Sequence, residues 1–240
     1  MIKEALQYLM GFRDVEIIDH DGIKYSNQQL VKFPEIKPNK IIETRSLASI
    51  VDLVKSELEH RRIDGLKIFV QVKTPTEVIV LTSLGDNLDR MSLYSAIADI
   101  PNLSLNNFID LEKMNIHLKS CFLPTDDREK VIQILGNVTE EAVKRSTDDG
   151  FSQTVVAKVG IAQKGNVAVP SIVVLKPFRT FLEVDQPESE FLLRMRTGSE
   201  VALFEADGGA WKMKARKNVK WDLEYHLGEE IKAGRVVILE

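Results

Sequence analysis

The sequence predicts an α+β fold, with helices mostly in the N-terminal 147 residues and an antiparallel, β-rich C-terminal part of sandwich-like or barrel-like form. In the N-terminal part, apolar residues recur every three or four positions, as on one face of a helix. From residue 151 on they alternate with polar ones, which is the period of a half-buried strand. No stretch rich in Gly, Ser or Pro divides the chain. We therefore expect a helix and arm-like segment over residues 1–45 and one α+β body over residues 46–240, with its β-rich region at 151–240.

The first elements are expected to be helical, with a polar segment between them. Residues 2–10 place their apolar side chains on one stripe and predict a short amphipathic helix. Residues 14–43 are polar and contain two prolines, so they predict short strands and loop in an arm. Ser46 is suited to cap a helix whose apolar face continues to Leu58, and Gly65 is a helix-stop signal.

The middle of the chain changes period twice. Residues 66–83 alternate between apolar and polar with a break at Pro75, which predicts a β-hairpin. Residues 91–100 predict a third strand. Residues 108–135 return to helical spacing, and a second helix is expected to begin after Thr125, where acidic residues suit the positive N-terminal end.

The C-terminal part is expected to be β-sheet throughout. Strands are predicted at 155–161, 172–174, 191–195 and 236–239. Residues 201–204 and 211–213 are expected to pair as a hairpin across the turn Asp207-Gly208-Gly209. Residues 219–227 keep a strict period of two and predict the cleanest half-buried strand of the chain.

Composition narrows the class of protein. The chain has 240 residues, a formal net charge of −4 and 44% apolar residues, which excludes wholesale disorder and a surface that coats nucleic acid all round. The one cysteine, Cys121, excludes an intramolecular disulfide and a multi-thiolate zinc site. No stretch approaches the roughly 18 apolar residues of a membrane helix, and residues 1–10 lack the features of an export signal. We therefore expect no membrane association and a cytoplasmic location.

The search for catalytic chemistry predicts no catalytic residue, no metal site and no cofactor. His117 precedes Cys121 by one helical turn, but no third group is evident to orient a base. Asp148 and Asp149 precede a glycine and have the chemistry to hold magnesium or act as an acid/base pair. Adjacent residues of an extended chain point to opposite faces, however, so a turn is the stronger interpretation. If the chain is an enzyme, a metal-dependent phosphodiesterase using these carboxylates is the runner-up.

A basic segment near the C-terminus suggests nucleic-acid binding. Its residues are Trp211, Lys212, Lys214, Arg216, Lys217, Lys220 and Trp221. Cationic side chains interleaved with aromatic rings are typical of a single-strand groove, where charge follows phosphates and rings stack on bases. On a strand, however, Trp211 and Met213 face away from the lysines, which would make the tryptophans core residues. Both interpretations stay open.

Two motif blocks resemble a known family. TDDGFSQTVVAKVG at 147–160 and PFRTFLEVDQPESEFLLRMR at 177–196 occur in the same order in the YfdQ-like family of phage and prophage proteins, which this chain resembles over roughly residues 65–227. Its first 60 residues look like versions from phages of Gram-positive bacteria. The family is described as of unknown function, so the resemblance implies neither a catalytic mechanism nor a cofactor.

The motif residues are the candidates for a shared binding surface. They are Asp148, Asp149, Gly150, Gln153, Arg179, Glu183, Gln186 and Glu190. The alternative is that they specify the fold, since turns and strand edges need such residues, and Arg179 is placed to pair with Glu183 or Glu190.

We therefore expect a phage- or prophage-encoded protein that is not an enzyme. It self-associates as a homo-oligomer and binds or sequesters a host or phage factor, or a small signalling molecule, in the cytoplasm of the bacterial host. Counter-defence is one such role. One alternative is a single-stranded nucleic-acid-binding accessory of phage replication or recombination. Another is a structural, shell-like assembly protein, since an N-terminal arm and a long hairpin are compatible with one.

Overall fold

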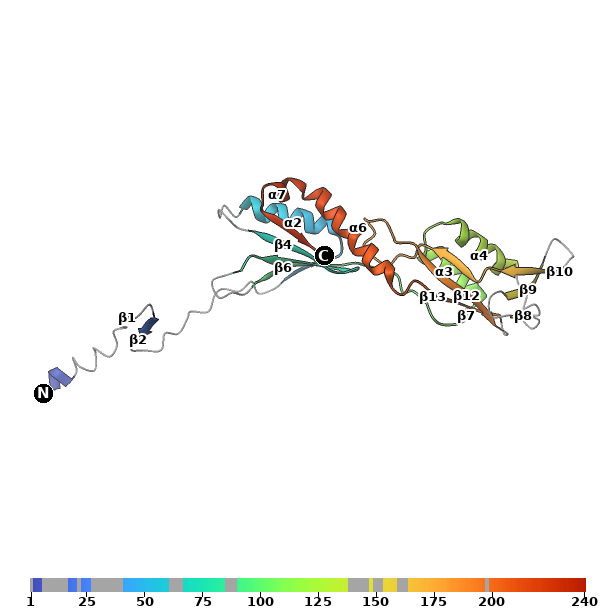
Figure 1. Ribbon diagram of the computed structural model, residues 1–240, viewed down its shortest axis with the longest axis horizontal. Helices are drawn as coiled ribbons and strands as arrows, with labels where there is room; N and C mark the ends of the chain where they lie inside the picture. The colour runs from blue at the N-terminus through green and yellow to red at the C-terminus, as the bar shows by residue number, and fades with distance from the viewer. Residues whose placement is uncertain are drawn as a thin grey trace. The chain divides into compact units, whose positions relative to one another are not determined.

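The computed structural model describes most of the chain and is drawn in Figure 1. The described residues are 2–5, 17–20, 23–26, 41–60, 67–84, 90–137, 147–148, 153–158, 164–196 and 199–240. Contacts divide the chain into residues 1–39 and residues 40–240. In the first unit, residues 2–5 are helical and β1 (Ile17–His20) pairs antiparallel with β2 (Ile23–Ser26). The rest of the predicted N-terminal helix, and most of the predicted arm, lie outside the described residues.

The second unit contains a five-stranded mixed sheet. Its strands, in spatial order, are β14 (Val236–Leu239), β4 (Ile68–Thr74), β5 (Glu77–Thr82), β6 (Ser92–Ile97) and β3 (Ile42–Thr44). The three central strands are antiparallel, and each edge strand runs parallel to its neighbour. The predicted hairpin at 66–83 and the predicted strand at 91–100 are confirmed by these pairings.

Three helices contact one face of this sheet: α2 (Leu47–His60), α6 (Ala210–His226) and α7 (Gly228–Lys232) (Figure 1). The Oγ of Ser46 accepts from the Ser49 backbone N–H at 3.2 Å, which is the expected N-cap of α2. The shared core is formed by alternate strand residues and by helix residues spaced three or four apart. Its members include Leu47, Ile50, Val54, Ile68, Val70, Val72, Val78, Val80, Val219, Leu223 and Leu227.

The other face of the five-stranded sheet is mixed in polarity, and we call it the open face. Gln71, Glu77 and Ser95 lie on it, together with six apolar residues that alternate with the core residues along the strands: Phe69, Ile79, Leu81, Ile97, Val237 and Leu239. All six are half-buried or exposed. Among the described residues, the helices that contact this sheet pack on its opposite face.

A second, antiparallel sheet has the order β11 (Ile172–Leu175), β12 (Ser189–Arg196), β13 (Glu200–Glu205), β7 (Ile109–Asp110). Helices α3 (Leu111–Cys121) and α4 (Asp126–Asn137) cover one face of it (Figure 1). Their N-caps follow the usual chemistry, because Asp110 accepts from the Lys113 N–H at 2.8 Å and Thr125 accepts from the Arg128 N–H at 3.1 Å. A third sheet has the order β10 (Lys164–Val169), β9 (Gln153–Lys158), β8 (Thr147–Asp148).

The loop between β11 and β12, residues 176–188, joins the two larger sheets. It contributes Phe181 and Val184 to the core of the five-stranded sheet. The hydroxyl of Thr180 donates to the backbone carbonyl of Pro75 in the β4–β5 turn. Most of the second motif block of the sequence therefore lies in a loop that connects two strands of one sheet and packs side chains into the core of the other.

The predicted distribution of helices and strands is wrong. Strands β4, β5 and β6 lie in the N-terminal 147 residues, and α6 and α7 lie in the C-terminal part. Over the described residues, the two larger sheets each pack helices on one face, so the C-terminal part is neither a sandwich nor a barrel. The segment predicted as the cleanest strand, residues 219–227, belongs to α6 and its C-cap. The predicted hairpin between 201–204 and 211–213 is wrong for the same reason, since the turn at Asp207–Gly209 leads into this helix.

Candidate functional site

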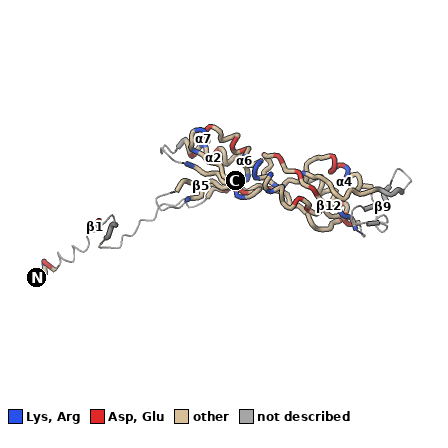
Figure 2. Tube along the Cα trace, viewed as in Figure 1, with Lys and Arg blue, Asp and Glu red and all other residues tan. Residues whose placement is uncertain are grey.

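Helix α6 carries the whole basic segment that the sequence singles out. Lys212, Lys214 and Lys217 are exposed, whereas Arg216 and Lys220 are half-buried. Figure 2 marks the lysines and arginines along the chain in blue. The buried positions of the helix are Ala215, Val219 and Leu223, which lie four residues apart and form its inward stripe. The basic side chains lie on the other sides of the first three turns, together with Trp211, Met213 and Asn218.

The two tryptophans have different environments. Trp211 is half-buried under the guanidinium of Arg179, whose Cζ is 4.0 Å from the ring centroid. Trp221 is 68% exposed, and it stacks on Tyr225, which is 72% exposed, with ring centroids 5.9 Å apart and planes at 20°. The interpretation of both tryptophans as core residues is therefore wrong for Trp221. A stacked aromatic pair in solvent is a marked exception to the rule that large apolar groups are buried.

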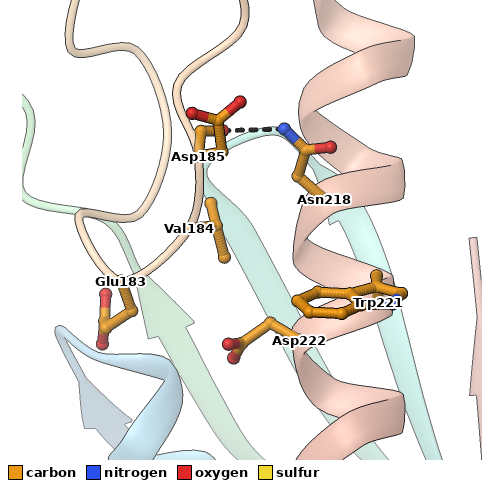
Figure 3. A pocket seen from close by; sticks show the side chains of 6 residues that line it. All are labelled: Glu183, Val184, Asp185, Asn218, Trp221 and Asp222. Carbon is orange, nitrogen blue, oxygen red and sulfur yellow. Dashed lines mark hydrogen bonds between the residues drawn. The ribbon is translucent and has the colours of Figure 1, made fainter. Parts of the chain in front are cut away.

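Trp221 forms one wall of a pocket of about 130 Å³, which we call the α6 pocket. The lining residues are Glu183, Val184, Asp185, Asn218, Trp221 and Asp222. Figure 3 shows the first three on the 176–188 loop and the other three projecting from α6 towards that loop. The carboxylates of Glu183 and Asp222 lie at one end of the pocket, and Asp185 lies at the other.

Hydrogen bonds fix the loop side of the α6 pocket. The side-chain oxygen of the buried Gln186 accepts from the backbone N–H groups of Arg179 and Thr180 at 2.9 and 3.2 Å. Its amide nitrogen donates to the carbonyls of Phe181 and Val184 at 2.9 and 3.2 Å. One side chain thus holds the loop in a closed turn, which pre-forms the pocket wall before any ligand binds.

Two further bonds tie this loop to the neighbouring helices. Asn218 donates to the Asp185 carbonyl at 2.7 Å (Figure 3), and Glu183 accepts from the Leu47 N–H at the start of α2 at 2.8 Å. The positive end of the α2 dipole therefore faces the Glu183 carboxylate, which fixes this side chain at the start of α2.

The carboxylates of the pocket interact with one another. Burial raises the pKa of Asp222, and the negative charge of Glu183 raises it further, while His226 has the opposite effect. His226 lies one turn along α6, with its Nδ1 3.6 Å from Asp222 Oδ2. At the other end, Asp185 pairs with Lys176 at 3.1 Å. The end of the pocket formed by Glu183 and Asp222 therefore concentrates negative charge beside the exposed ring of Trp221.

Arg179 is the centre of a second polar cluster. It is 2% exposed, and its guanidinium contacts Glu205 at 2.8 Å and also donates to Ser189, which in turn donates to Asp207 at 2.8 Å. Burial lowers the pKa of Arg179 to about 10, although Glu205 and Asp207 raise it. The partners of Arg179 include Glu205, Ser189 and the Trp211 ring, so the predicted pairing with Glu183 or Glu190 is wrong. In this environment the residue holds β12, β13 and the start of α6 together.

The remaining motif residues lie elsewhere. Glu190 is exposed on β12, opposite Val174 of β11. Asp148 and Gln153 occupy facing positions of β8 and β9. Asp149 and Gly150 lie outside the described residues. Of the predicted binding residues, the structure brings Glu183 to the α6 pocket and places Gln186 and Arg179 at buried positions of the same loop.

His117 and Cys121, the histidine and cysteine singled out by the sequence, are engaged in packing. His117 is buried, and its Nε2 accepts from the Ser104 N–H at 3.0 Å, so this nitrogen is not available as a base for the buried Cys121. Burial lowers the pKa of His117, which keeps the imidazole neutral. Within the described ranges, no group of three or more His, Cys, Asp or Glu side chains is arranged to hold a metal ion. In the same part of the chain, no helix has the length and hydropathy to cross a membrane.

Sequence reasoning missed most of the α6 pocket. Asn218, Asp222 and Tyr225 have no role in a strand interpretation, because alternation would place Asn218 and Asp222 on a solvated face and Tyr225 in the core. The signal that was available is the four-residue spacing of Val219, Leu223 and Leu227, which is equally a helical pattern.

Comparison of the chain with family models, curated proteins and solved structures found no match. The fold and the site together define an α+β protein with a preformed acidic and aromatic pocket.

Proposed function

We propose that this protein acts by binding, without catalysis, and that the surface around Trp221 and Tyr225 is where it engages its partner. The exposed aromatic stack at the mouth of a pocket whose loop is held by internal hydrogen bonds carries this proposal. Tryptophan and tyrosine concentrate binding energy at interfaces because they offer large, rigid contact areas.

The setting proposed for this activity follows from the family resemblance. A phage- or prophage-encoded protein of this kind would capture a host or phage factor in the cytoplasm of the infected bacterium, and counter-defence is one use of such capture. The open face supports self-association as a homo-oligomer, since its row of apolar residues across three strands, Val237, Phe69 and Leu81, is the kind of sheet surface that subunits bury between them.

Site-specific photo-crosslinking tests the binding surface. A photoreactive phenylalanine analogue placed at Tyr225 is expected to give a discrete adduct in bacterial cells, and the adduct should disappear when Trp221→Ala is added. The matched control is the same analogue at Ile116 of α3, which is 60% exposed and lies on the other helical layer. Equal adducts from both positions, or none from Tyr225, contradict the proposal. Turnover of a nucleotide or nucleic acid that is lost in an Asp148→Asn, Asp149→Asn variant also contradicts it.

A second candidate function is single-stranded nucleic-acid binding. It is favoured by the exposed Lys212, Lys214 and Lys217 on the helix that carries the aromatic stack. It predicts that binding of a fluorescent oligothymidine falls steeply with salt and weakens when Lys212, Lys214 and Arg216 become Glu. Binding that is absent or insensitive to salt removes this candidate. The carboxylates around Trp221 weigh against it, because they repel phosphates at the ring that would stack on bases.

A further inference from the structure

The α6 pocket has the charge of a site for a cation. Among the described residues, those that line it include three carboxylates, Glu183, Asp185 and Asp222, and neither lysine nor arginine. Asp185 is paired with Lys176 and Asp222 lies beside His226, so the Glu183 and Asp222 end is where a ligand cation would be held. Glu183 and Asp222 are close enough for the charge of one to raise the pKa of the other. A positive group between them would relieve this repulsion, whereas a phosphate or carboxylate ligand would add to it.

The aromatic wall of the pocket favours an organic cation over a metal ion. The rings and carboxylates come from α6 and the loop: Trp221 and Asp222 project from the helix towards Val184 on the loop (Figure 3). A small, strongly hydrated metal ion gains little from such a ring. A planar organic cation gains from both walls, since it stacks on the indole face and donates hydrogen bonds to the carboxylates in its own plane.

The chain itself contains a completed version of this arrangement. The guanidinium of Arg179 lies 4.0 Å from the centroid of Trp211 and 2.8 Å from Glu205, with Asp207 reached through Ser189. The α6 pocket presents the same partners, an indole ring and two carboxylates, ten residues further along the same helix. What it lacks is the arginine.

We propose that the α6 pocket binds the guanidinium group of an arginine side chain supplied by a partner protein. The guanidinium stacks on Trp221 and donates to Asp222 and Glu183. Glu183 keeps one carboxylate oxygen on the Leu47 N–H and has the other for the ligand. This inference rests on the proposed binding function and adds the chemistry that the pocket recognises.

Calorimetric titration with short, otherwise neutral peptides tests this specificity. Each peptide carries one arginine, one lysine or one citrulline, which is the neutral isostere of arginine. The arginine peptide should bind about tenfold more tightly than the citrulline peptide, with the lysine peptide between them, because only the guanidinium combines charge, a planar fork and stacking. Equal binding of the arginine and citrulline peptides overturns the proposal, as does failure of the arginine peptide to bind.

Variants locate the binding. Asp222→Asn and Glu183→Gln should each weaken the arginine peptide by about tenfold, because each removes a charge and leaves a side chain of the same shape. Glu183→Gln retains an oxygen for the Leu47 N–H. The matched control is Glu224→Gln, an exposed residue of α6 outside the pocket, which should leave the affinity unchanged. Equal losses in all three variants would indicate a general charge effect and overturn the site.

Free agmatine distinguishes a protein ligand from a small molecule. It should bind more weakly than the arginine peptide, because the flanking peptide contacts the exposed Tyr225. Agmatine that binds more tightly than the peptide would overturn the assignment to a partner protein. Photo-crosslinking at Tyr225 that persists while every arginine titration fails would reject the guanidinium site and leave the proposed binding function standing.

Discussion

His117 shows how one buried side chain makes stability depend on pH. Its Nε2 accepts from the Ser104 N–H. Protonation of Nε2 would replace this acceptor with an N–H that points at the Ser104 N–H, and the hydrogen bond would be lost. Burial lowers the pKa of the folded His117 below the value of about 6.5 in the unfolded chain. Above that pH the residue is neutral in both states. As the pH falls below it, the unfolded chain takes up a proton that the folded one does not, and stability falls.

His117→Gln is expected to remove this contribution, because the glutamine oxygen can accept from Ser104 and does not titrate. The measurement is the free energy of unfolding by urea at several values between pH 7 and pH 5. The wild type should lose more stability across this range than the variant. Parallel pH profiles for the two proteins would contradict the neutral, accepting imidazole.

The left-handed backbone conformation at position 209 requires glycine. Gly209 is the N-cap of α6 with a φ of 82°, a conformation that side chains with a Cβ rarely adopt. Gly209→Ala should destabilise the protein by about 1 kcal/mol through backbone strain alone, since an added Cβ meets only the side chain of Lys212 at 3.9 Å. Gly136→Ala, in helix α4 with nothing within 4 Å of the added Cβ, should instead stabilise by about 0.5–1 kcal/mol. Thermal or urea unfolding of the two variants gives the comparison, and equal signs would contradict it.

At the scale of elements, apolar residues that are close together in α6 differ strongly in burial. Leu223 is fully buried, whereas Trp221 and Tyr225 are exposed. Leu223→Ala should therefore cost about 2–5 kcal/mol, and Trp221→Ala or Tyr225→Ala under about 1 kcal/mol, in free energy of unfolding. If residues 219–227 were a strand, all three side chains would share one buried face and all three losses would be large.

The same segment shows why the sequence predicts some elements and not others. A period of two contains a period of four, so Val219, Leu223 and Leu227 fit a strand face and a helix stripe equally well. The run from Ala210 to His226 contains neither Gly nor Pro and only one β-branched residue, which favours a helix, but the alternation outweighed this propensity in the prediction. The hairpin at 66–83 was less ambiguous, because Pro75 divides it into two runs that are too short for typical helices and rich in β-branched residues.

The candidate site was predictable only in part. Glu183 was named because it lies in a motif block, but nothing local to it indicates that Asn218 and Asp222 stand opposite. Those contacts join a loop to a helix more than thirty positions away, and they depend on which way the helix turns its stripe. Long-range placement of this kind follows from packing the loop and the helix into one hydrophobic core, which local residue patterns do not encode.

At the scale of the whole molecule, the open face predicts the oligomeric state. Ile97 and Leu239 are each 40% exposed on it, and a lysine there would place a charge in a subunit interface. The wild type is expected to elute as an oligomer in size-exclusion chromatography with light scattering, and Ile97→Lys with Leu239→Lys should shift it to the monomer mass. Ile116→Lys, on exposed α3 surface, is the control and should leave the mass unchanged. A monomeric wild type contradicts self-association, and a large discrete particle favours the shell-like alternative.

Tryptophan fluorescence decides between the candidate functions of α6 in two parallel titrations of one variant. In a Trp211→Phe variant, Trp221 is the only tryptophan and reports on its own surface. A peptide with one arginine should change its emission, and an oligothymidine at the same ionic strength should not, because the pocket around the ring is acidic. A response to the oligothymidine alone would contradict recognition of a cationic protein group at Trp221 and assign the helix to nucleic-acid binding.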